Sequence, residues 1–362
     1  MNNNIIIRLS LFCICVALLS CSDTGTGQKT ISQETMQKVY EEVKTPFKYG
    51  IVLSAPDSAK MADSPTVFRL NNKWYMTYII FDGTGYETWI AESDDLLQWK
   101  TQGKIMSFTE NTWDANQKAG YPALVDITWN GSYEPMKYNE RYWVSYLGGA
   151  DKGYEAGRLG VGMSYTDNIA EAKELERLPQ PVLSAIDSSA QWYDNKTIFK
   201  SSVIHDADKK SGYPFVMYYN AAGDSVGANG HSFESIAMAV SNDMQHWQRQ
   251  GDRPLLSKGR GICGDAQIVK MKDLYVMFYF GHNWKDGDPS AFDRFACSYD
   301  LVHWTEWDGQ HLIEPSEPFD KQYAHKPWVI KWEGVVYHFY NAVGEKGRVI
   351  ALATSKDLRE KE

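Results

Sequence analysis

A seven-residue motif, Ser-x-Asp-(Leu/Met)-x-x-Trp, recurs along this chain of 362 residues. Three copies are complete, one is cut short and one is kept only loosely. They begin at Ser93, Ser164, Ser241, Ser298 and Ser355, which gives spacings of 71, 77, 57 and 57 residues. Such spacings fit whole multi-stranded units with variable loops and are too long for single hairpins. The short polar side chains of the motif suit a turn, and its Trp suits the space between two units.

Each unit contains the same succession of short segments rich in aromatic and β-branched residues, as expected for strands. An aromatic second strand is expected at 73–78, 141–146, 215–219 and 335–340. Tandem units of four strands predict an all-β fold, a five-bladed β-propeller.

The last unit ends at 355–358, which leaves no room for its fourth strand. Residues 50–55 resemble the expected fourth strands 181–185 and 254–258. We therefore expect the N-terminal strand to complete the last blade and close the ring, because an unfinished sheet would expose an open edge. Residues 47–362 are predicted to form a single catalytic domain.

Composition narrows the range of partners. The chain has 13 Trp and 22 Tyr, a formal net charge of −9 and a pI near 5.5. Nucleic-acid binding needs a basic surface, so this balance argues against it. Abundant aromatic rings suit both β-strands and the stacking of sugar rings.

The N-terminus resembles a bacterial lipoprotein signal. Arg8 precedes the apolar run 9–19, and Leu18-Leu19-Ser20-Cys21 resembles a lipobox. Residues 1–20 are thus predicted to be a signal peptide, Cys21 to carry lipid and 21–29 to be a polar tether. The alternative is an ordinary signal peptide with a chance cysteine. The lipobox predicts a cell-envelope lipoprotein, periplasmic or on the outer surface, whose only contact with the membrane is the lipid.

Cys263 and Cys297 are the cysteines left for the folded domain. They are expected on or beside the first strand and on the third strand of the fourth unit. Strands two positions apart in a sheet lie beyond the Cα separation of a disulfide, so both thiols should be free.

Residues 30–46 are predicted to contain one helix. Thr30-x-x-Gln33 resembles a capping box, and Met36, Val39, Tyr40 and Val43 form one apolar stripe that ends before Pro46. The stripe is expected to pack on the side of the domain. The alternative is a dimer contact through this helix.

In a propeller, the innermost strand of each blade starts at the mouth of a central funnel. Asp63, Asp265 and His325 stand at such starts in the first, fourth and fifth units. Two acids and an imidazole at one mouth suit cleavage of a glycosidic bond by general acid–base catalysis. The residues expected to bind substrate there are Trp113, Tyr121, Trp192, Lys200, Trp284 and Trp328.

These motifs resemble the five-bladed glycoside hydrolases of families 43, 32, 117 and 130, and the resemblance covers about residues 47–358. It implies that Asp63 is the general base. Family 43 has a Glu general acid where this chain has Asp265, and family 117 uses an Asp and a His, which Asp265 and His325 would match. Either of the two could then be the proton donor.

Family 43 also carries a third Asp, which tunes the pKa of the acid. Here that position is Lys200, with Asp194 and Asp206 as the nearest acids. The resemblance implies no required cofactor and no catalytic metal. Family members often hold a structural calcium ion in the central channel, although no ligand-rich loop of this sequence signals one.

The resulting prediction is an exo-acting, inverting glycoside hydrolase that acts on oligosaccharides from plant or algal polysaccharides, of furanoside or galactose/anhydrogalactose type. One alternative is a phosphorylase of the family 130 kind, with Lys200, Lys326 and Arg158 as the phosphate pocket. The other is a surface lipoprotein that binds carbohydrate without cleaving it.

Overall fold

The computed structural model describes residues 30–226, 232–259, 261–285 and 290–359. The predicted signal peptide, Cys21 and the tether lie outside the described residues. Within that part of the chain, no helix is long and apolar enough to cross a membrane.

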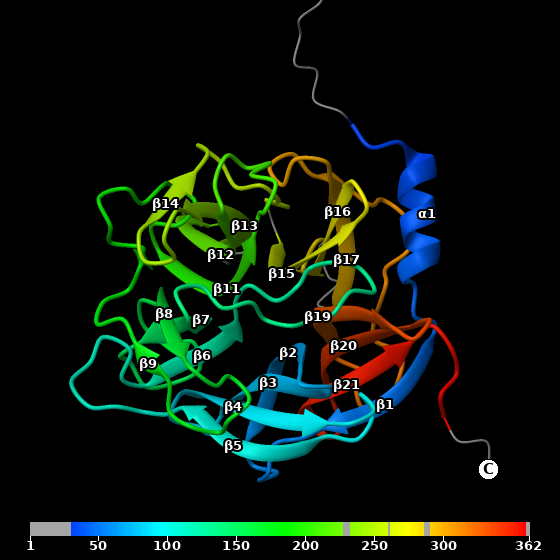
Figure 1. Ribbon diagram of the computed structural model, residues 1–362, viewed down its shortest axis with the longest axis horizontal. Coiled ribbons are helices and arrows are strands. Elements are labelled where there is room, and N and C mark those ends of the chain that lie inside the picture. Colours follow the sequence, from blue (N-terminus) through cyan, green and yellow to red (C-terminus); the bar gives the residue numbers. More distant parts are fainter. Residues whose placement is uncertain (1–29, 227–231, 260, 286–289, 360–362) are drawn as a thin grey trace, which may run out of the picture.

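The described chain is nearly all β, with one short helix, α1 (Gln33–Val43). The strands form successive antiparallel meanders arranged about a common centre (Figure 1). The first meander contains β2 (Met61–Leu70), β3 (Lys73–Phe81), β4 (Tyr86–Ser93) and β5 (Lys100–Met106). The next contains β6 (Gln117–Pro122), β7 (Tyr142–Gly149) and β8 (Gly160–Thr166), with β9 (Glu176–Arg177) and β10 (Leu183–Ser184) both paired to β8.

The later meanders follow the same order. One contains β11 (Thr197–His205), β12 (Phe215–Val226), β13 (Ser232–Ser241) and β14 (Trp247–Gln250). Another contains β15 (Ile262–Met271), β16 (Leu274–His282), β17 (Ala291–Ser298) and β18 (Thr305–Glu306). The last contains β19 (Tyr323–Trp332), β20 (Val335–Gly344) and β21 (Gly347–Thr354), and β1 (Phe47–Leu53) pairs antiparallel with β21.

The first strands of the meanders face the centre of the molecule. Contacts link β2 to β6, β6 to β11, β11 to β15, β15 to β19 and β19 to β2. This arrangement is consistent with a β-propeller. Its inner strands start together at one end of the centre and finish together at the other.

The three complete copies of the recurrent motif form the same turn. In the copy at 298–304, Ser298 Oγ accepts from the backbone N–H of Leu301, and Asp300 Oδ1 accepts from the N–H groups of Val302 and His303. The indole of Trp304 donates to the carbonyl of Leu301. The copies at 93–99 and 241–247 repeat these bonds. The motif therefore has the structural role that the sequence indicates.

The indole rings of the motif also join neighbouring meanders. Trp304 meets Tyr218 of β12 edge-on, with ring centroids 5.9 Å apart, and Trp99 meets Phe339 of β20 in the same way at 5.8 Å. The apolar core lies between the sheets at these contacts.

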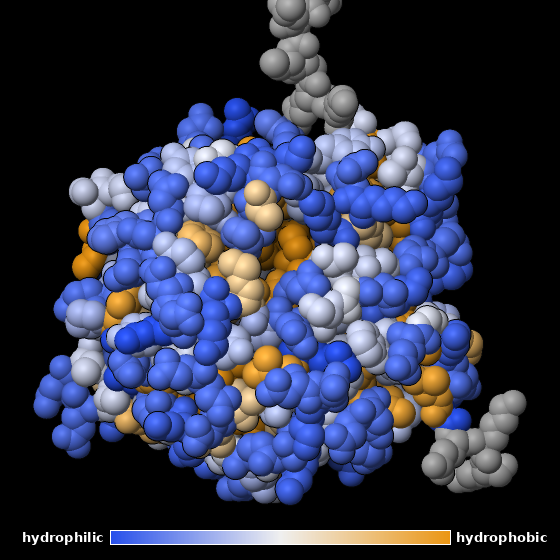
Figure 2. All heavy atoms as spheres, in the orientation of Figure 1, coloured by the Kyte–Doolittle hydropathy of each residue, from blue (hydrophilic) through white to orange (hydrophobic). Residues whose placement is uncertain are grey.

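Helix α1 packs on the chain itself. Met36, Val39 and Val43 are buried in a cluster that includes Phe278 and Phe295 of the fourth meander. Figure 2 shows hydrophilic residues over the outer side of this helix. The apolar stripe proposed for a dimer contact is thus covered within one chain.

The predicted start of this helix was wrong by two residues. The N-cap is Ser32, whose Oγ accepts from the N–H of Thr35, and Thr30 precedes the helix. Ser32 is an equally good capping residue. Thr30 was expected to be the N-cap only because Gln33 follows it at the spacing of a capping box.

Cys263 lies on β15 and Cys297 on β17, with β16 between them. Both are buried and free, as predicted from strand order.

A long loop at 123–141 fills the centre at the end where the inner strands finish (Figure 1). Backbone hydrogen bonds tie it to Arg69, Val203 and Lys270, and Tyr133 Oη accepts from the N–H of Lys331. These partners belong to β2, β11, β15 and β19. A cavity of only about 20 Å³ remains between this central loop and the inner strands.

Candidate active site

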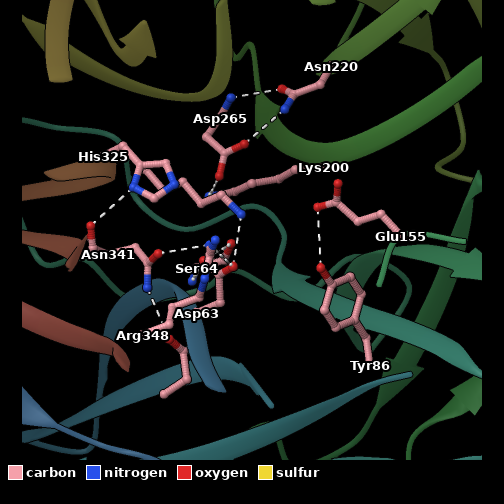
Figure 3. Close-up of polar contacts among 12 residues, drawn as sticks. Asp63, Ser64, Tyr86, Glu155, Lys200, Asn220, Asp265, His325, Asn341 and Arg348 are labelled. Atoms are coloured by element: carbon pink, nitrogen blue, oxygen red, sulfur yellow. Dashed lines mark hydrogen bonds and ion pairs between the residues drawn. The ribbon is translucent and has the colours of Figure 1, made fainter. Parts of the chain in front are cut away.

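A cavity of about 180 Å³ lies at the opposite end of the centre, where the inner strands start. It brings together Asp63, Asp265 and His325, as predicted, with Tyr121 and Lys200. It also contains polar residues that sequence reasoning did not assign to catalysis, namely Glu155, Glu234, Lys326 and Arg348. Figure 3 shows how most of these side chains converge from different strands.

Several of these residues stand on β-bulges. The register of the inner strand shifts after Asp63, Gly264 and His325, and the next residue has positive φ: 49° at Ser64, 59° at Asp265 and 63° at Lys326. A left-handed backbone at a non-glycine residue is strained, and such bulges re-aim side chains at functional sites. The prediction that Asp63 and Asp265 occupy equivalent positions was therefore wrong by one residue. Gly264 is the equivalent of Asp63.

The Asp63 carboxylate is buried and surrounded by donors. Lys326 Nζ lies 3.0 Å and Arg348 Nη1 2.8 Å from Oδ2, and the N–H of Ser64 donates to Oδ1 at 2.7 Å. Burial alone would raise the pKa of this group. The charges of Lys326 and Arg348 outweigh burial and hold the pKa of Asp63 well below its usual value. Asp63 is therefore ionised and a weak proton acceptor.

Asp265 is held by Asn220 and Lys200. The N–H of Asp265 donates to Asn220 Oδ1 at 2.8 Å, and Asn220 Nδ2 donates to Asp265 Oδ1 at 2.9 Å. The second oxygen, Oδ2, lies 3.2 Å from Lys200 Nζ, without the geometry of a hydrogen bond. This buried pair thus retains bonding capacity at the cavity.

His325 is buried, and its Nδ1 lies 3.2 Å from the carbonyl of Asn341, which fixes the proton on Nδ1. Burial, reinforced by the charges of Arg348 and Lys326, lowers the pKa of His325 well below its usual value. The neutral ring is a poor proton donor, which weighs against the His325 alternative.

Glu234, on β13, is the acid with the most strongly raised pKa in the cavity. Burial, together with the charges of Glu155 and Asp265, raises the pKa of Glu234 to about 8. Asn220 Nδ2, which donates to Asp265, also donates to Glu234 Oε1 at 2.9 Å. Glu234 is therefore protonated at neutral pH.

Glu155 stands in the loop after β7, and Tyr86 Oη donates to its Oε1 at 3.3 Å. Burial raises the pKa of Glu155 against the opposing charge of Lys326. Its φ is +48°, and it lies between Gly153 and Gly157, both with positive φ. That glycine-flanked acid was a signal in the sequence. Glu234 had none, because it lies near the start of a third strand rather than a first.

The aromatic residues predicted to bind substrate do not all lie at the cavity. Tyr121 lines the cavity, and Lys200 Nζ lies 5.0 Å from the centroid of its ring. The four tryptophans predicted to bind substrate, Trp113, Trp192, Trp284 and Trp328, do not line it.

Each of these tryptophans has another setting. Trp113 stacks on Tyr146, and Trp328 is buried, with its indole donating to the carbonyl of Val67. The indole of Trp192 donates to the carbonyl of Asp252 on the outer surface, and Trp284 lines a separate cavity beside Phe292. Sequence proximity to a strand start was therefore a poor guide to ring direction.

The two acids nearest in sequence to Lys200, at the position of the family 43 pKa modulator, have other partners. Asp194 pairs with Arg249 and accepts from Tyr219 Oη, and Asp206 accepts from Ser211. Neither lines the cavity.

Two of the three cations proposed for a phosphate pocket, Lys200 and Lys326, line the active-site cavity. Lys200 and Lys326 pair with Asp265 and Asp63, whereas Arg158 lines an adjoining cavity. The described ranges contain no group of three or more His, Cys, Asp or Glu side chains that could hold a metal ion, and a structural calcium ion in the central channel stays a prediction.

No protein-family model matches the chain, and no curated protein matches it. Two solved structures, one of a complex of BT0996 with RGII and one named "Glycoside hydrolase", each match with 46% identity and a TM-score of 0.86. Each match covers 92% of this chain and 97% of the other.

A more distant match is Zg3597, a family 117 glycoside hydrolase produced by the marine bacterium Zobellia galactanivorans. It has 14% identity and a TM-score of 0.59, and the match covers 89% of this chain and 93% of that one. At this identity the likeness shows the fold alone, whereas the 46% matches are similar in sequence over 92% of this chain. The chain belongs to the β-propeller glycoside hydrolases and is a glycosidase.

Proposed function

We propose that this protein is an exo-acting, inverting glycoside hydrolase that removes a terminal sugar from plant or algal oligosaccharides. The observation that carries the proposal is a set of carboxyl groups in one cavity whose pKa values are driven apart. Glu234 has a pKa of about 8, while that of Asp63 lies well below its usual value. Such divergence separates a proton donor from carboxylates that stay ionised.

Glu234 is the proposed general acid. It is protonated at neutral pH and lines the cavity, so it can protonate the glycosidic oxygen as the bond to the anomeric carbon breaks. Asp265 and Lys200 then bind hydroxyl groups of the terminal sugar, since Asp265 Oδ2 and Lys200 Nζ both lack a hydrogen-bond partner among the described residues. This assignment moves Asp265 from proton donor to substrate binding.

Two carboxylates compete for the role of base. Asp63, predicted from sequence, is committed to Lys326, Arg348 and Ser64, and its low pKa makes it a weak base. Glu155 accepts a hydrogen bond from the Tyr86 hydroxyl and has a raised pKa, so it accepts a proton more readily. We assign the activation of water to Glu155 and the ordering of Lys326 and Arg348 to Asp63.

The exo mode is supported by the central loop at 123–141. It closes the end of the centre opposite the cavity, so a polysaccharide chain could not pass through. We infer that the meanders are the five blades of the propeller and that β1 closes the ring through β21. A blind pocket in such a ring suits recognition of a chain end.

The substrate is inferred from the relative named as a complex with RGII, which supports an oligosaccharide of that kind. We further propose that residues 1–29 provide a signal peptide and tether, with lipid on Cys21 and the enzyme at the cell envelope. That placement would bring the cavity to imported or external oligosaccharides.

The test is incubation of the full-length protein with RGII oligosaccharides and with a panel of arabinofuranosides, galactofuranosides, galactosides and anhydrogalactosides. Release of one monosaccharide from the end of the oligosaccharide, equal with and without inorganic phosphate, is expected. Release that depends on phosphate would indicate a phosphorylase. Glycan binding without cleavage would indicate the non-catalytic alternative.

A further inference from the structure

A second cavity, of about 400 Å³, adjoins the active-site cavity. The two share Glu155, Phe199 and Glu234 in their linings. The proposed acid must lie beside the glycosidic oxygen, so the scissile bond lies at this boundary. One sugar then occupies the active-site cavity and the next occupies the second cavity.

The two cavities differ in how their charges are matched. In the active-site cavity, Lys326 and Arg348 share Asp63, and Lys200 faces Asp265. The second cavity is lined by Arg158 and Lys196, and its acidic lining residues are the shared Glu155 and Glu234.

Glu234 is neutral at pH 7, so a single carboxylate, Glu155, faces the two cations of the second cavity. Arg158 has neither a hydrogen bond nor an ion pair with any residue in the described ranges. Within the described ranges, Arg158 therefore presents a guanidinium without a partner at this lining, which an anionic ligand would neutralise.

We propose that the second cavity is the leaving-group subsite and that it binds an acidic sugar, a uronate, through Arg158 and Lys196. This inference rests on the proposed function. A guanidinium presents paired N–H donors that match the two oxygens of a carboxylate, and the neighbouring ammonium adds attraction. The enzyme then cleaves the bond between a terminal sugar and a uronate.

The bond changes balance as a hydrolysis. Glu234 gives its proton to the glycosidic oxygen, which leaves on the uronate as a hydroxyl group. Water bonds to the anomeric carbon and gives a proton to Glu155. Proton return to Glu234 through solvent restores the enzyme.

The test compares two substrates that differ in one group: an oligosaccharide with a uronate next to the terminal sugar, and the same compound with its carboxyl group reduced to an alcohol. We expect kcat/KM to be roughly tenfold or more higher for the uronate, since hydrogen bonds to charged groups are stronger than those to neutral ones. High salt should reduce the ratio, because the subsite is open to solvent. Arg158→Gln should bring the ratio to roughly threefold or below.

Arg253→Gln is the matched control, because Arg253 is an exposed arginine that does not line either cavity. It should keep the wild-type ratio. Equal cleavage of both substrates by the wild type, or an unchanged ratio in Arg158→Gln, would overturn the subsite. Phosphate-dependent cleavage lost in Arg158→Gln would assign the second cavity to phosphate instead.

A binding measurement separates this inference from the proposed function. Galacturonate and glucuronate are titrated into the full-length protein by calorimetry, with galactose and glucose as neutral counterparts. Uronate binding that weakens at least roughly tenfold in Arg158→Gln, without cleavage of any glycoside, would keep the subsite and reject the hydrolase. Cleavage of a glycoside without uronate preference or uronate binding would keep the hydrolase and reject the uronate subsite.

Discussion

Lys326 Nζ lies 3.0 Å from Asp63 Oδ2, and this ion pair joins β19 to β2 at the start of both strands. Arg348 adds a second cation to the same oxygen at 2.8 Å. The pair therefore fixes the active-site cavity where the last and first meanders meet. Its removal would leave two poorly exposed cations without their anion.

We expect Asp63→Asn to lower the free energy of unfolding by about 3–5 kcal/mol, the usual cost of breaking a buried pair. The pKa of Asp63 is depressed in the fold, so the carboxylate contributes its full stability above its unfolded value of about 3.9 and loses it as the pH falls through the folded value. Urea unfolding from pH 7 downward measures both effects. Glu34→Gln, in an exposed pair with Lys38, should leave the stability close to that of the wild type, because exposed ion pairs contribute little.

The same variant decides between the two proposed roles of Asp63. If Asp63 is the base, Asp63→Asn should lower kcat by roughly 10²–10⁴-fold and leave KM unchanged. If Asp63 instead orders Lys326 and Arg348, Asp63→Asn should also raise KM. A pure kcat effect with unchanged stability would return the base assignment to Asp63.

Glu234→Gln is expected to lower kcat on an oligosaccharide by roughly 10²–10⁴-fold. An aryl glycoside with an activated leaving group needs no proton, so much of its rate should remain. The wild-type rate on the oligosaccharide should fall as pH rises through about 8, where Glu234 loses its proton. Glu345→Gln, at an exposed carboxylate, provides the control. Equal losses on both substrates would reject Glu234 as the acid.

Glu155→Gln should lose activity on both kinds of substrate, because activation of water is needed whatever the leaving group. NMR of the first sugar anomer released by the wild type should show inversion. Inverting enzymes separate their two carboxyl groups by about 6.5–9.5 Å, whereas a nucleophile requires about 5–5.5 Å. Retention would make Glu155 a nucleophile and contradict the inverting scheme.

Cys263 and Cys297 should resist alkylation in the folded protein, because both are buried and burial raises the pKa of each thiol. After denaturation without reductant, peptide mass mapping should find both cysteines alkylated. A disulfide-linked pair of peptides would contradict the order β15, β16, β17.

Tyr133→Phe tests the central loop. Tyr133 Oη accepts from the N–H groups of Asn130 and Lys331, each at 2.9 Å. Removing this acceptor should cost about 1–3 kcal/mol of stability, measured by urea unfolding. The value of kcat should stay within about twofold, since Tyr133 does not line the active-site cavity. A large loss of kcat with unchanged stability would show that the loop has a different role.

The sequence predicted the strand order well because the repeated turn is a local property. Ser298 and Asp300 bind the backbone within their own turn, so their pattern is visible without the fold. The pairing of β1 with β21 could also be predicted, from a missing strand and a similar segment elsewhere.

The site was harder to predict because it depends on contacts between distant segments. Asp265 is displaced by a bulge that no local pattern marks. Glu234 acquires its raised pKa from burial and from Glu155, which is 79 residues away in the sequence. Ring direction is likewise set by packing, which is why Trp328 points into the core.

The central loop also constrains the order of events in a catalytic cycle. The central loop closes the far end of the propeller, so products must leave through the same opening by which substrate enters. In the proposed exo mode, a sugar cleaved at the bottom of the pocket stays behind the rest of the oligosaccharide until that part departs. Under the proposed exo mode, the liberated monosaccharide is thus the last product to leave and should inhibit competitively, and each oligosaccharide should be released after every cut.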